Sequence, residues 1–332
     1  MPLAGDLSRG DNNARDAYRI RSYYPASPPI SAWSYVTVAV SRMALRPVPE
    51  FSEELPRTAT DDEILQWSLS YLRHAPLSLA VREINRLIAF QSVSGSKGPV
   101  LDVGCGDGFW WTVRRDEREI YGIDISVGEI MQARERIAAE VSDISRRRPF
   151  PDITFEEMIG NCSLEHVPDI DAALSNLRRS ASDRARLIMF VPTPRWAYQG
   201  HLQSLLLKRA PRVAMAVSGA FNGFFQHWHV YDAKVWQRLL EQNGWRVEST
   251  QGLGSSRSEF LFRLFLPPSL LEFLFKKVTG FYPARLARHL PDSVLMPFAR
   301  LVRWGLTNPI VAADAPQAYE YVIVARAASP AP

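Results

Sequence analysis

Apolar positions along the middle of the chain follow two alternating patterns. Short runs rich in β-branched residues, typical of buried strands, are separated by stretches in which apolar residues recur at helical spacing. Strands that alternate with helices in this way predict an α/β protein with a doubly wound sheet. The expected strands are 100–103, 120–124, 155–161, 186–191, 245–250 and 319–325, and the expected helices are 109–113, 126–140, 169–180 and 232–243.

The chain before the first strand divides into an irregular part and a helical part. Residues 1–59 are rich in proline, serine and arginine and show no sustained period, which predicts an irregular N-terminal arm. Thr60-Asp-Asp-Glu63 is a capping-box pattern, and apolar residues then repeat at helical spacing. A second amphipathic helix is expected over 77–90. These two helices, within residues 60–98, either serve only to pack on the domain or also cap a ligand pocket.

Two long insertions interrupt the alternation after the strand at 186–191. Residues 193–231 hold an apolar helical stretch with little charge. Residues 255–317 form a segment that is far too long for a plain connection between two antiparallel strands. It is rich in phenylalanine and leucine, and Pro267-Pro268 is expected to interrupt its helices. The core domain is then expected to consist of residues 99–254 and 318–327.

The stretch from Asp102 to Gly108 is the strongest sign of chemistry. Three glycines at G-x-G-x-G spacing follow the first strand, where they let the backbone turn and let a ligand approach the main chain. A strand, a glycine turn and a helix N-terminus form a nucleotide-binding arrangement. A dinucleotide fingerprint needs a further glycine where this chain has Phe109. The carboxylates of Asp102 and Asp107 suit a ligand with a positive end, such as S-adenosylmethionine, rather than a pyrophosphate.

A further acid lies at the end of the next strand. Asp124 follows Gly104 by 20 residues, a spacing at which a carboxylate accepts hydrogen bonds from ribose hydroxyls. A glycine loop alone would be weak evidence for a nucleotide site. The loop and the acid together, at this spacing, are strong evidence.

These motifs resemble those of class I S-adenosylmethionine-dependent methyltransferases, in the subgroup that includes ubiquinone-biosynthesis-type enzymes. The likeness covers residues 60–254 and the last strand, and it includes Asn161-Cys-Ser-Leu-Glu-His-Val167. The resemblance implies a Rossmann-like, seven-stranded sheet with an antiparallel last strand, helices that cap the cofactor pocket, and S-adenosylmethionine as the cofactor. The residues that it places at the cofactor are Asp102, Gly104, Cys105, Gly106, Gly108, Asp124, Ile125, Asp143, Asn161, Cys162 and Leu164.

Composition narrows the range of partners. The chain has 332 residues and a net charge of +4, too small to indicate a nucleic-acid partner. Its two cysteines exclude a disulfide framework, and neither a signal peptide nor a membrane span is visible, so we expect a cytoplasmic protein. No group of histidine, cysteine and acidic residues has metal-ligand spacing, so no metal is expected. The oligomeric state stays open.

Histidines near the expected carboxyl edge of the sheet are candidates for a general base. Methyl transfer from a sulfonium is a direct displacement, and it needs a base only where the acceptor loses a proton. His166 follows the strand at 155–161, and His227 and His229 end the first insertion. We take His166 and, of the latter pair, His229 as the catalytic candidates. The alternative for each is a packing or surface role.

The sequence therefore predicts methyl transfer to a small, hydrophobic molecule, such as a lipid, a quinone or a secondary metabolite. The alternative is a non-catalytic S-adenosylmethionine-binding or scaffold protein of the same fold. Residues 255–312 carry eight basic and three acidic residues, 8 − 3 = +5, interleaved with aromatic and aliphatic ones. This pattern is typical either of a lid over a substrate pocket or of a peripheral membrane contact. A pocket lined by charged side chains would count against the hydrophobic substrate.

Overall fold

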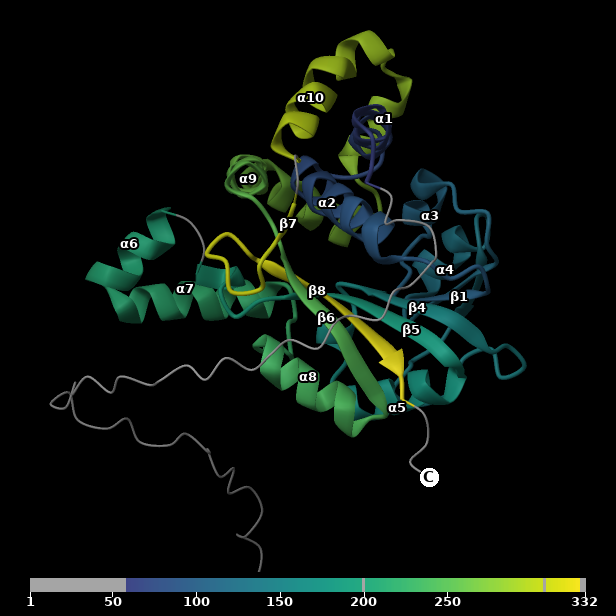
Figure 1. Cartoon of the computed structure of the whole chain (residues 1–332). Helices are drawn as coiled ribbons and strands as arrows, with labels where there is room; N and C mark the ends of the chain where they lie inside the picture. Colours follow the sequence, from purple (N-terminus) through teal and green to yellow (C-terminus); the bar gives the residue numbers. More distant parts are fainter. Residues whose placement is uncertain (1–57, 199–200, 307–308, 329–332) are drawn as a thin grey trace, which may run out of the picture. The chain divides into compact units, whose positions relative to one another are not determined.

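The predicted strands form a single sheet of eight strands in the computed structural model, which describes residues 58–198, 201–306 and 309–328 (Figure 1). The strand order is β3-β2-β1-β4-β5-β8-β6-β7. Strands β1 to β5 run parallel, whereas β8 is antiparallel to β5 and β6 is antiparallel to β8. The bounds are β1 Val100–Val103, β2 Ile120–Asp124, β3 Ala138–Val141, β4 Phe155–Asn161, β5 Ala181–Pro192, β6 Trp245–Leu253, β7 Ile310–Val311 and β8 Glu320–Ala327.

The doubly wound sheet with an antiparallel last strand is confirmed, but the expected number of seven strands was wrong. Strand β6 continues beyond the predicted residue 250 to Leu253. Its last residues pair with the two-residue strand β7, Gly252 with Val311 and Leu253 with Ile310. This short edge strand has too few residues to show a periodic pattern in the sequence.

The helix predicted over 126–140 was also wrong in its second half. Helix α4 spans Val127–Ala133, and Ser126 caps it by accepting a hydrogen bond from the Glu129 amide at 3.3 Å. The chain then forms β3, whose residues 138–141 pair with residues 121–124 of β2. Alanine and glutamate favour a helix there, but pairing at the sheet edge outweighs that local preference.

Two helices precede the first strand, as predicted. Helix α1 spans Asp61–Leu72 and begins with the expected capping box, in which the Thr60 amide donates to Glu63 Oε2 at 2.8 Å. Helix α2 spans Leu77–Val93 and buries most of its side chains. The predicted irregular arm falls almost entirely on residues 1–57, which lie outside the described residues, so it stays a prediction.

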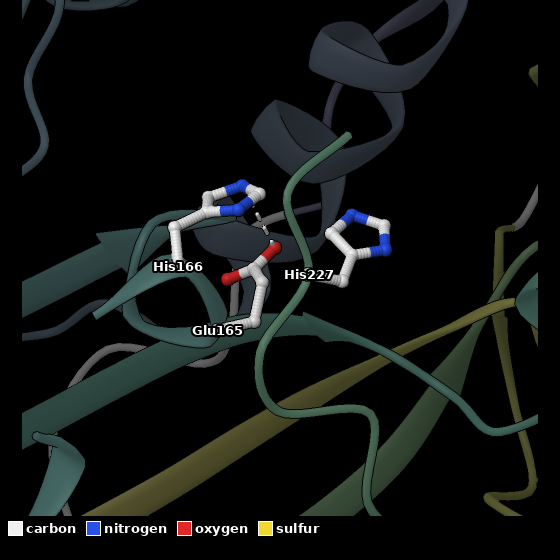
Figure 2. Close-up of side chains that lie close together, drawn as sticks. All are labelled: Glu165, His166 and His227. Carbon is white, nitrogen blue, oxygen red and sulfur yellow. Dashed lines mark ion pairs between the residues drawn. The ribbon is translucent and has the colours of Figure 1, made fainter. Parts of the chain in front are cut away.

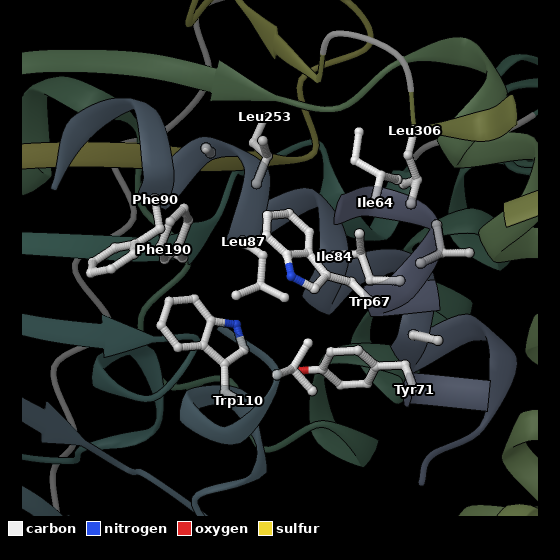
Figure 3. Close-up of a cluster of buried hydrophobic side chains, with 14 of the residues drawn as sticks. Ile64, Trp67, Tyr71, Ile84, Leu87, Phe90, Trp110, Phe190, Leu253 and Leu306 are labelled. Carbon is white, nitrogen blue, oxygen red and sulfur yellow. The ribbon is translucent and has the colours of Figure 1, made fainter. Parts of the chain in front are cut away.

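The hydrophobic core lies on both faces of the sheet. Alternate residues of β5 point to opposite faces, so that Ile188 and Phe190 join one cluster and Leu187 and Met189 join the other. The first cluster includes side chains of α1, α2 and α3 (Phe109–Arg114), and Figure 3 shows part of it. The second includes side chains of α5 (Ile170–Ser180) and α8 (Ala233–Gln242). Helices therefore cover both faces, which leaves the strand ends for ligands.

Both insertions are helical. The first holds η2 (Trp196–Tyr198), α6 (His201–Arg209) and α7 (Pro211–Phe224). The second holds α9 (Ser256–Thr279), η3 (Pro283–His289) and α10 (Asp292–Gly305). Helix α9 continues through Pro267 and Pro268, where an interruption was predicted, and it packs against α2, with Ser269 Oγ accepting from the Ser78 amide at 3.2 Å. Among the described residues, no helix is long and apolar enough to cross a membrane.

Candidate active site

The glycines after β1 hold their loop open to a ligand. Gly104, Gly106 and Gly108 have positive φ angles of 75°, 55° and 72°. A Cβ atom at Gly104 would lie 2.5 Å from Cβ of Ser163, so no side chain fits there. At Gly106, by contrast, no atom of the described residues, apart from Gly106 and its two chain neighbours, lies within 4 Å of the place that a Cβ would take. The loop thus combines a close approach to the segment after β4 with open space in front of Gly106.

Asp102 presents a buried carboxylate with a free oxygen. Its side chain lies at the end of β1, and the residue is 3% exposed. Oδ2 accepts a hydrogen bond from Trp111 Nε1 at 2.6 Å, whereas Oδ1 has no hydrogen-bond partner among the described residues. Burial raises the pKa of Asp102 to about 7, although the hydrogen bond from Trp111 opposes the rise. A buried, unpaired carboxylate oxygen of this kind suits a cationic ligand group.

Asp124 ends β2 and faces the same loop. Its Oδ2 accepts from the Gly106 amide at 3.1 Å, and its Oδ1 accepts from the Ser126 amide at 2.8 Å. Burial raises the pKa of Asp124, and these backbone donors oppose the rise. The next side chain, Ile125, is 76% exposed. A carboxylate held in this way can accept hydrogen bonds from a ribose, and an exposed apolar side chain beside it can pack against a flat base.

The other residues expected at the cofactor divide into three groups. Asp143 follows β3, and its carboxylate accepts hydrogen bonds from the amide and hydroxyl of Ser145 at 2.9 and 2.6 Å. Cys105 and Leu164 point into the core, so their side chains do not face the loop. Asn161 and Cys162, at the end of β4, instead line a neighbouring cavity.

That cavity lies at the carboxyl ends of β4 and β5 and has a volume of about 200 Å³. Its walls come from α2, from η1 (Leu164–His166) and from both insertions. One part is apolar and consists of Leu79, Cys162, Pro192, Trp196, Phe225, Phe262, Leu266 and Phe273. The other part is polar and consists of Ser78, Arg82, Glu83, Arg86, Asn161, Glu165, His166, His227 and Glu320. Several of these polar side chains pair with one another, as Arg82 and Arg86 do with Glu320, so the lining suits an occupant that combines an apolar body with one polar end.

Two arginines of α2 are fixed by a buried acid on β8. Arg86 donates to both oxygens of Glu320, from Nε to Oε2 at 3.0 Å and from Nη2 to Oε1 at 2.7 Å. Arg82 forms an ion pair with the same carboxylate, and its guanidinium lies 3.7 Å from the ring centroid of Trp196. Burial acts to raise the pKa of Glu320, but the two arginines overcome this effect and lower it to about 2. The network therefore carries fixed charge into the cavity.

Glu165, His166 and His227 meet at the polar end of the cavity (Figure 2). Glu165 is 1% exposed, and its Oε1 lies 3.8 Å from His166 Nε2. The amides of Trp228 and His229 donate to the Glu165 carbonyl oxygen at 2.9 and 3.1 Å, which holds His227 opposite η1. Burial raises the pKa of Glu165 to about 7 and lowers the pKa of His227 to about 4. Sequence spacing had excluded a cluster of metal-ligand type, but the fold assembles one.

His229, the second catalytic candidate, does not line the cavity. Its Nε2 donates to the Val167 carbonyl oxygen at 2.8 Å, and its Nδ1 accepts from the Tyr231 hydroxyl at 3.0 Å. Both ring nitrogens are thus engaged, and the residue is buried. A catalytic role for His229 stays a prediction from the sequence alone, whereas His166 and the unselected His227 do line the cavity.

The second insertion also contacts the glycine loop. Arg285 of η3 donates to Asp107 Oδ2 at 2.9 Å and to Gln132 Oε1 of α4 at 3.0 Å. Lys276 of α9 lies 2.8 Å from Glu129 Oε1, also on α4. These contacts tie 276–285 to the elements that surround the loop.

Comparison with known families decides what kind of site this is. A family model described as a methyltransferase domain matches residues 71–250. The chain belongs to this family. It is a class I S-adenosylmethionine-dependent methyltransferase, and its cofactor is S-adenosylmethionine. A comparison of this methyltransferase with curated protein sequences found no match.

Solved methyltransferase structures are similar to this methyltransferase at low identity. Phosphoethanolamine N-methyltransferase 2 of Haemonchus contortus, solved with S-adenosyl-L-methionine, is 13% identical at a TM-score of 0.43, over 81% of this chain and 57% of that one. A SAM-dependent methyltransferase of Thermotoga maritima is 13% identical at a TM-score of 0.44, over 75% of this chain and 91% of that one. A TehB-like SAM-dependent methyltransferase of Corynebacterium glutamicum is 15% identical at a TM-score of 0.35, over 51% of this chain and 75% of that one. Because these TM-scores are low, the assignment rests on the family model.

The residues around the loop fit S-adenosylmethionine. The unpaired oxygen of Asp102 suits the ammonium group of its amino-acid end, and the open space at Gly106 leaves room for a ligand against the backbone. Asp124 would hold the ribose and Ile125 would cover the adenine. When bound, the cofactor supplies a methyl group on a positively charged sulfur. The individual roles of these residues, like membership of the ubiquinone-biosynthesis subgroup, remain predictions.

Proposed function

We propose that this methyltransferase transfers the methyl group of S-adenosylmethionine to a small molecule with an apolar body and one polar end. The cavity of about 200 Å³ carries this proposal, because it is lined by Asn161 and Cys162, and the next residue, Ser163, approaches Gly104 of the glycine loop. Its apolar wall would hold the body of the acceptor. Its polar wall, with Glu165 and His166, would hold the group that receives the methyl. This substrate class narrows the small, hydrophobic molecule predicted from the sequence to one that also carries a polar end.

The surrounding elements support exclusion of water from the reaction. Methyl transfer depends chiefly on alignment of the two reactants and on a dry site. Phe262, Leu266 and Phe273 of α9 line the cavity, while Arg285, in the same insertion, contacts the glycine loop. One insertion thus touches both places where a reactant would lie, and we propose that it acts as a lid.

A cavity-filling substitution tests the proposed acceptor site. Leu79→Trp would fill part of the cavity without touching the loop residues. We expect S-adenosylmethionine affinity within about twofold of wild type and a loss of turnover of at least about tenfold, since the acceptor no longer fits. Turnover is followed as S-adenosylhomocysteine release in metabolite extracts, by mass spectrometry. Leu207→Trp, on the exposed surface of α6, is the matched control.

The same experiment separates the enzyme from its alternative. A non-catalytic binding protein would bind S-adenosylmethionine calorimetrically but release no S-adenosylhomocysteine with any extract. Full turnover in Leu79→Trp would instead show that the acceptor binds elsewhere.

A second proposal concerns membrane contact through the insertions. Large apolar side chains are exposed along α7 and α9: Val213, Met215, Val217, Phe224, Phe260, Leu264, Leu271, Leu274, Phe275 and Val278. Exposed basic residues Lys208, Arg209, Arg212 and Lys277 lie in the same helices or next to them. Apolar side chains flanked by cations are typical of interfacial helices, and each cation near an anionic surface contributes about 1 kcal/mol.

Flotation with vesicles of phosphatidylglycerol and phosphatidylcholine tests this contact. We expect wild-type protein to float at low salt and to float less at high salt, because salt screens the basic residues. Met215→Asp should reduce flotation severalfold. Met131→Asp, on α4, is a matched control because the two methionines are 62% and 67% exposed. Without flotation at low salt, the insertions would be left with the lid role alone.

A further inference from the structure

Glu165 is the least compensated acid of the cavity. It is 1% exposed, and neither of its carboxylate oxygens has a hydrogen-bond partner among the described residues. The two arginines nearby are already committed to Glu320. A buried carboxylate is unfavourable in its charged form unless a cation lies against it, and the closest side-chain nitrogen that an ion pair gives Glu165 is His166 Nε2, at 3.8 Å. Two imidazoles, those of His166 and His227, lie beside the Glu165 carboxylate and could bind a cation together with it (Figure 2).

The hydrogen bonds of the two histidines leave one nitrogen of each free. His166 Nδ1 lies 3.1 Å from the Gln226 carbonyl oxygen, which can only accept, so Nδ1 carries the proton and Nε2 keeps its lone pair. His227 Nδ1 lies 3.2 Å from Asn222 Oδ1 and is oriented in the same way. Imidazoles that ligate a metal usually donate their other N–H to such an oxygen.

We propose that Glu165, His166 and His227 bind a divalent transition-metal ion at the polar end of the acceptor cavity. One ligand atom from each residue lies within 4.8 Å of the other two. Ligands bound to zinc at about 2.0–2.1 Å lie about 3.3 Å apart in a tetrahedron, so modest side-chain rotations would close the site. Glu165 and His166 come from η1 and His227 from the loop after α7, which the Glu165 carbonyl already holds in place.

The donor set favours some metals over others. Two imidazole nitrogens and one carboxylate oxygen suit Zn²⁺, Fe²⁺ or Mn²⁺, whereas Mg²⁺ prefers an all-oxygen shell. Three protein ligands leave at least one coordination position for a ligand from the cavity, which is the pattern of catalytic rather than structural zinc.

The ion would select the chemistry of the acceptor. This step rests on the proposed function, because it requires the acceptor to bind in the cavity. An oxygen of the acceptor, most simply a hydroxyl, would take the open position. A bound divalent cation lowers the pKa of a hydroxyl, so its proton leaves to solvent at neutral pH as the acceptor binds, before the site closes, and no histidine needs to act as the base. The inferred substrate class is therefore a hydroxylated molecule with an apolar body.

Metal titration without cofactor or acceptor tests the site. The purified chain is stripped with EDTA, dialysed, and titrated with Zn²⁺ by calorimetry and with Co²⁺ by visible absorption. We expect one ion per chain and d–d bands without thiolate charge transfer. Glu165→Gln and His227→Asn should each weaken binding at least about tenfold, the lower limit known even for outer-shell partners. His289→Asn removes an exposed histidine of η3 and should bind as wild type does.

The outcomes separate the site from its proposed role. Equal binding by wild type and both variants would overturn the site, as would thiolate charge transfer from Cys162, which lines the same cavity. If Glu165→Gln fails to fold, as judged by circular dichroism, His227→Asn decides. Normal metal binding together with methyl transfer that EDTA does not affect would keep the site and overturn its role. Metal binding without any methyl transfer would count against the proposed function instead.

Discussion

The charged form of one carboxylate, that of Asp102, lowers the stability of the protein and favours binding of the cofactor. Its pKa in the folded protein is about 7, against an ordinary value of 3.8, because the side chain is buried. Between about pH 4 and pH 7 the folded state therefore holds a proton that the unfolded state has released. The free energy of unfolding falls as the pH rises through this window and stays lower above it.

We expect Asp102→Asn to stabilise the protein without cofactor at pH 8, by up to about 4 kcal/mol, and to have almost no effect at pH 4. The asparagine oxygen can still accept from Trp111, so the geometry is kept. The same substitution should weaken S-adenosylmethionine binding at pH 8 about tenfold or more, because an interaction with a charged group is lost. Denaturant unfolding and calorimetry measure the two effects, with Asp152→Asn as an exposed control. A stability gain that is equal at both pH values would contradict the assigned protonation.

At the scale of elements, Arg285 is the point where η3 touches the glycine loop. It joins Asp107 to Gln132, and its side chain is 20% exposed. Removal of such a half-buried ion pair is expected to cost about 1 kcal/mol. Arg285→Gln should therefore speed S-adenosylmethionine dissociation about fivefold in stopped-flow experiments. Arg263→Gln should not, since its ion pair, with Glu259, lies within α9. Unchanged dissociation in Arg285→Gln would remove the lid role over the cofactor.

Elements with a strong local pattern were predictable, and elements that depend on distant partners were not. The strands 100–103, 120–124 and 155–161 match the structure because a buried strand needs a continuous apolar run. The strand at 138–141 was missed because its alanines and glutamate gain strand structure only by pairing with β2. Helix α9 was expected to break at Pro267, but its packing against α2 outweighs the lost hydrogen bond.

At the scale of the whole molecule, the acceptor cavity was the least predictable part. Asp102 precedes the glycine loop and Asp124 ends the next strand, so the spacing between these two signals was enough to infer that they lie together. The cavity instead joins residues 82, 165, 227 and 320, which only the fold brings together. One local signal was a pair of arginines at positions 82 and 86 on an amphipathic helix, a spacing that places both on one face. His227 and His229 are separated by one residue, and the sequence gave no means to tell which of them lines the cavity. The choice of His229 over His227 therefore had no structural basis.

The position of β8 in the sheet has a consequence for the order in which this protein is made. Strand β8 lies between β5 and β6, and its Glu320 fixes Arg82 and Arg86 of the early helix α2. During translation, all the other residues that line the cavity are synthesised before Glu320. Until then, β6 has no neighbour through which to join β5 in the sheet, and Arg82 and Arg86 lack the carboxylate that they share. The cavity is therefore completed late in synthesis, and a ribosome that stalls before residue 320 releases a chain with an open sheet edge and exposed apolar surface, a substrate for chaperones rather than an enzyme.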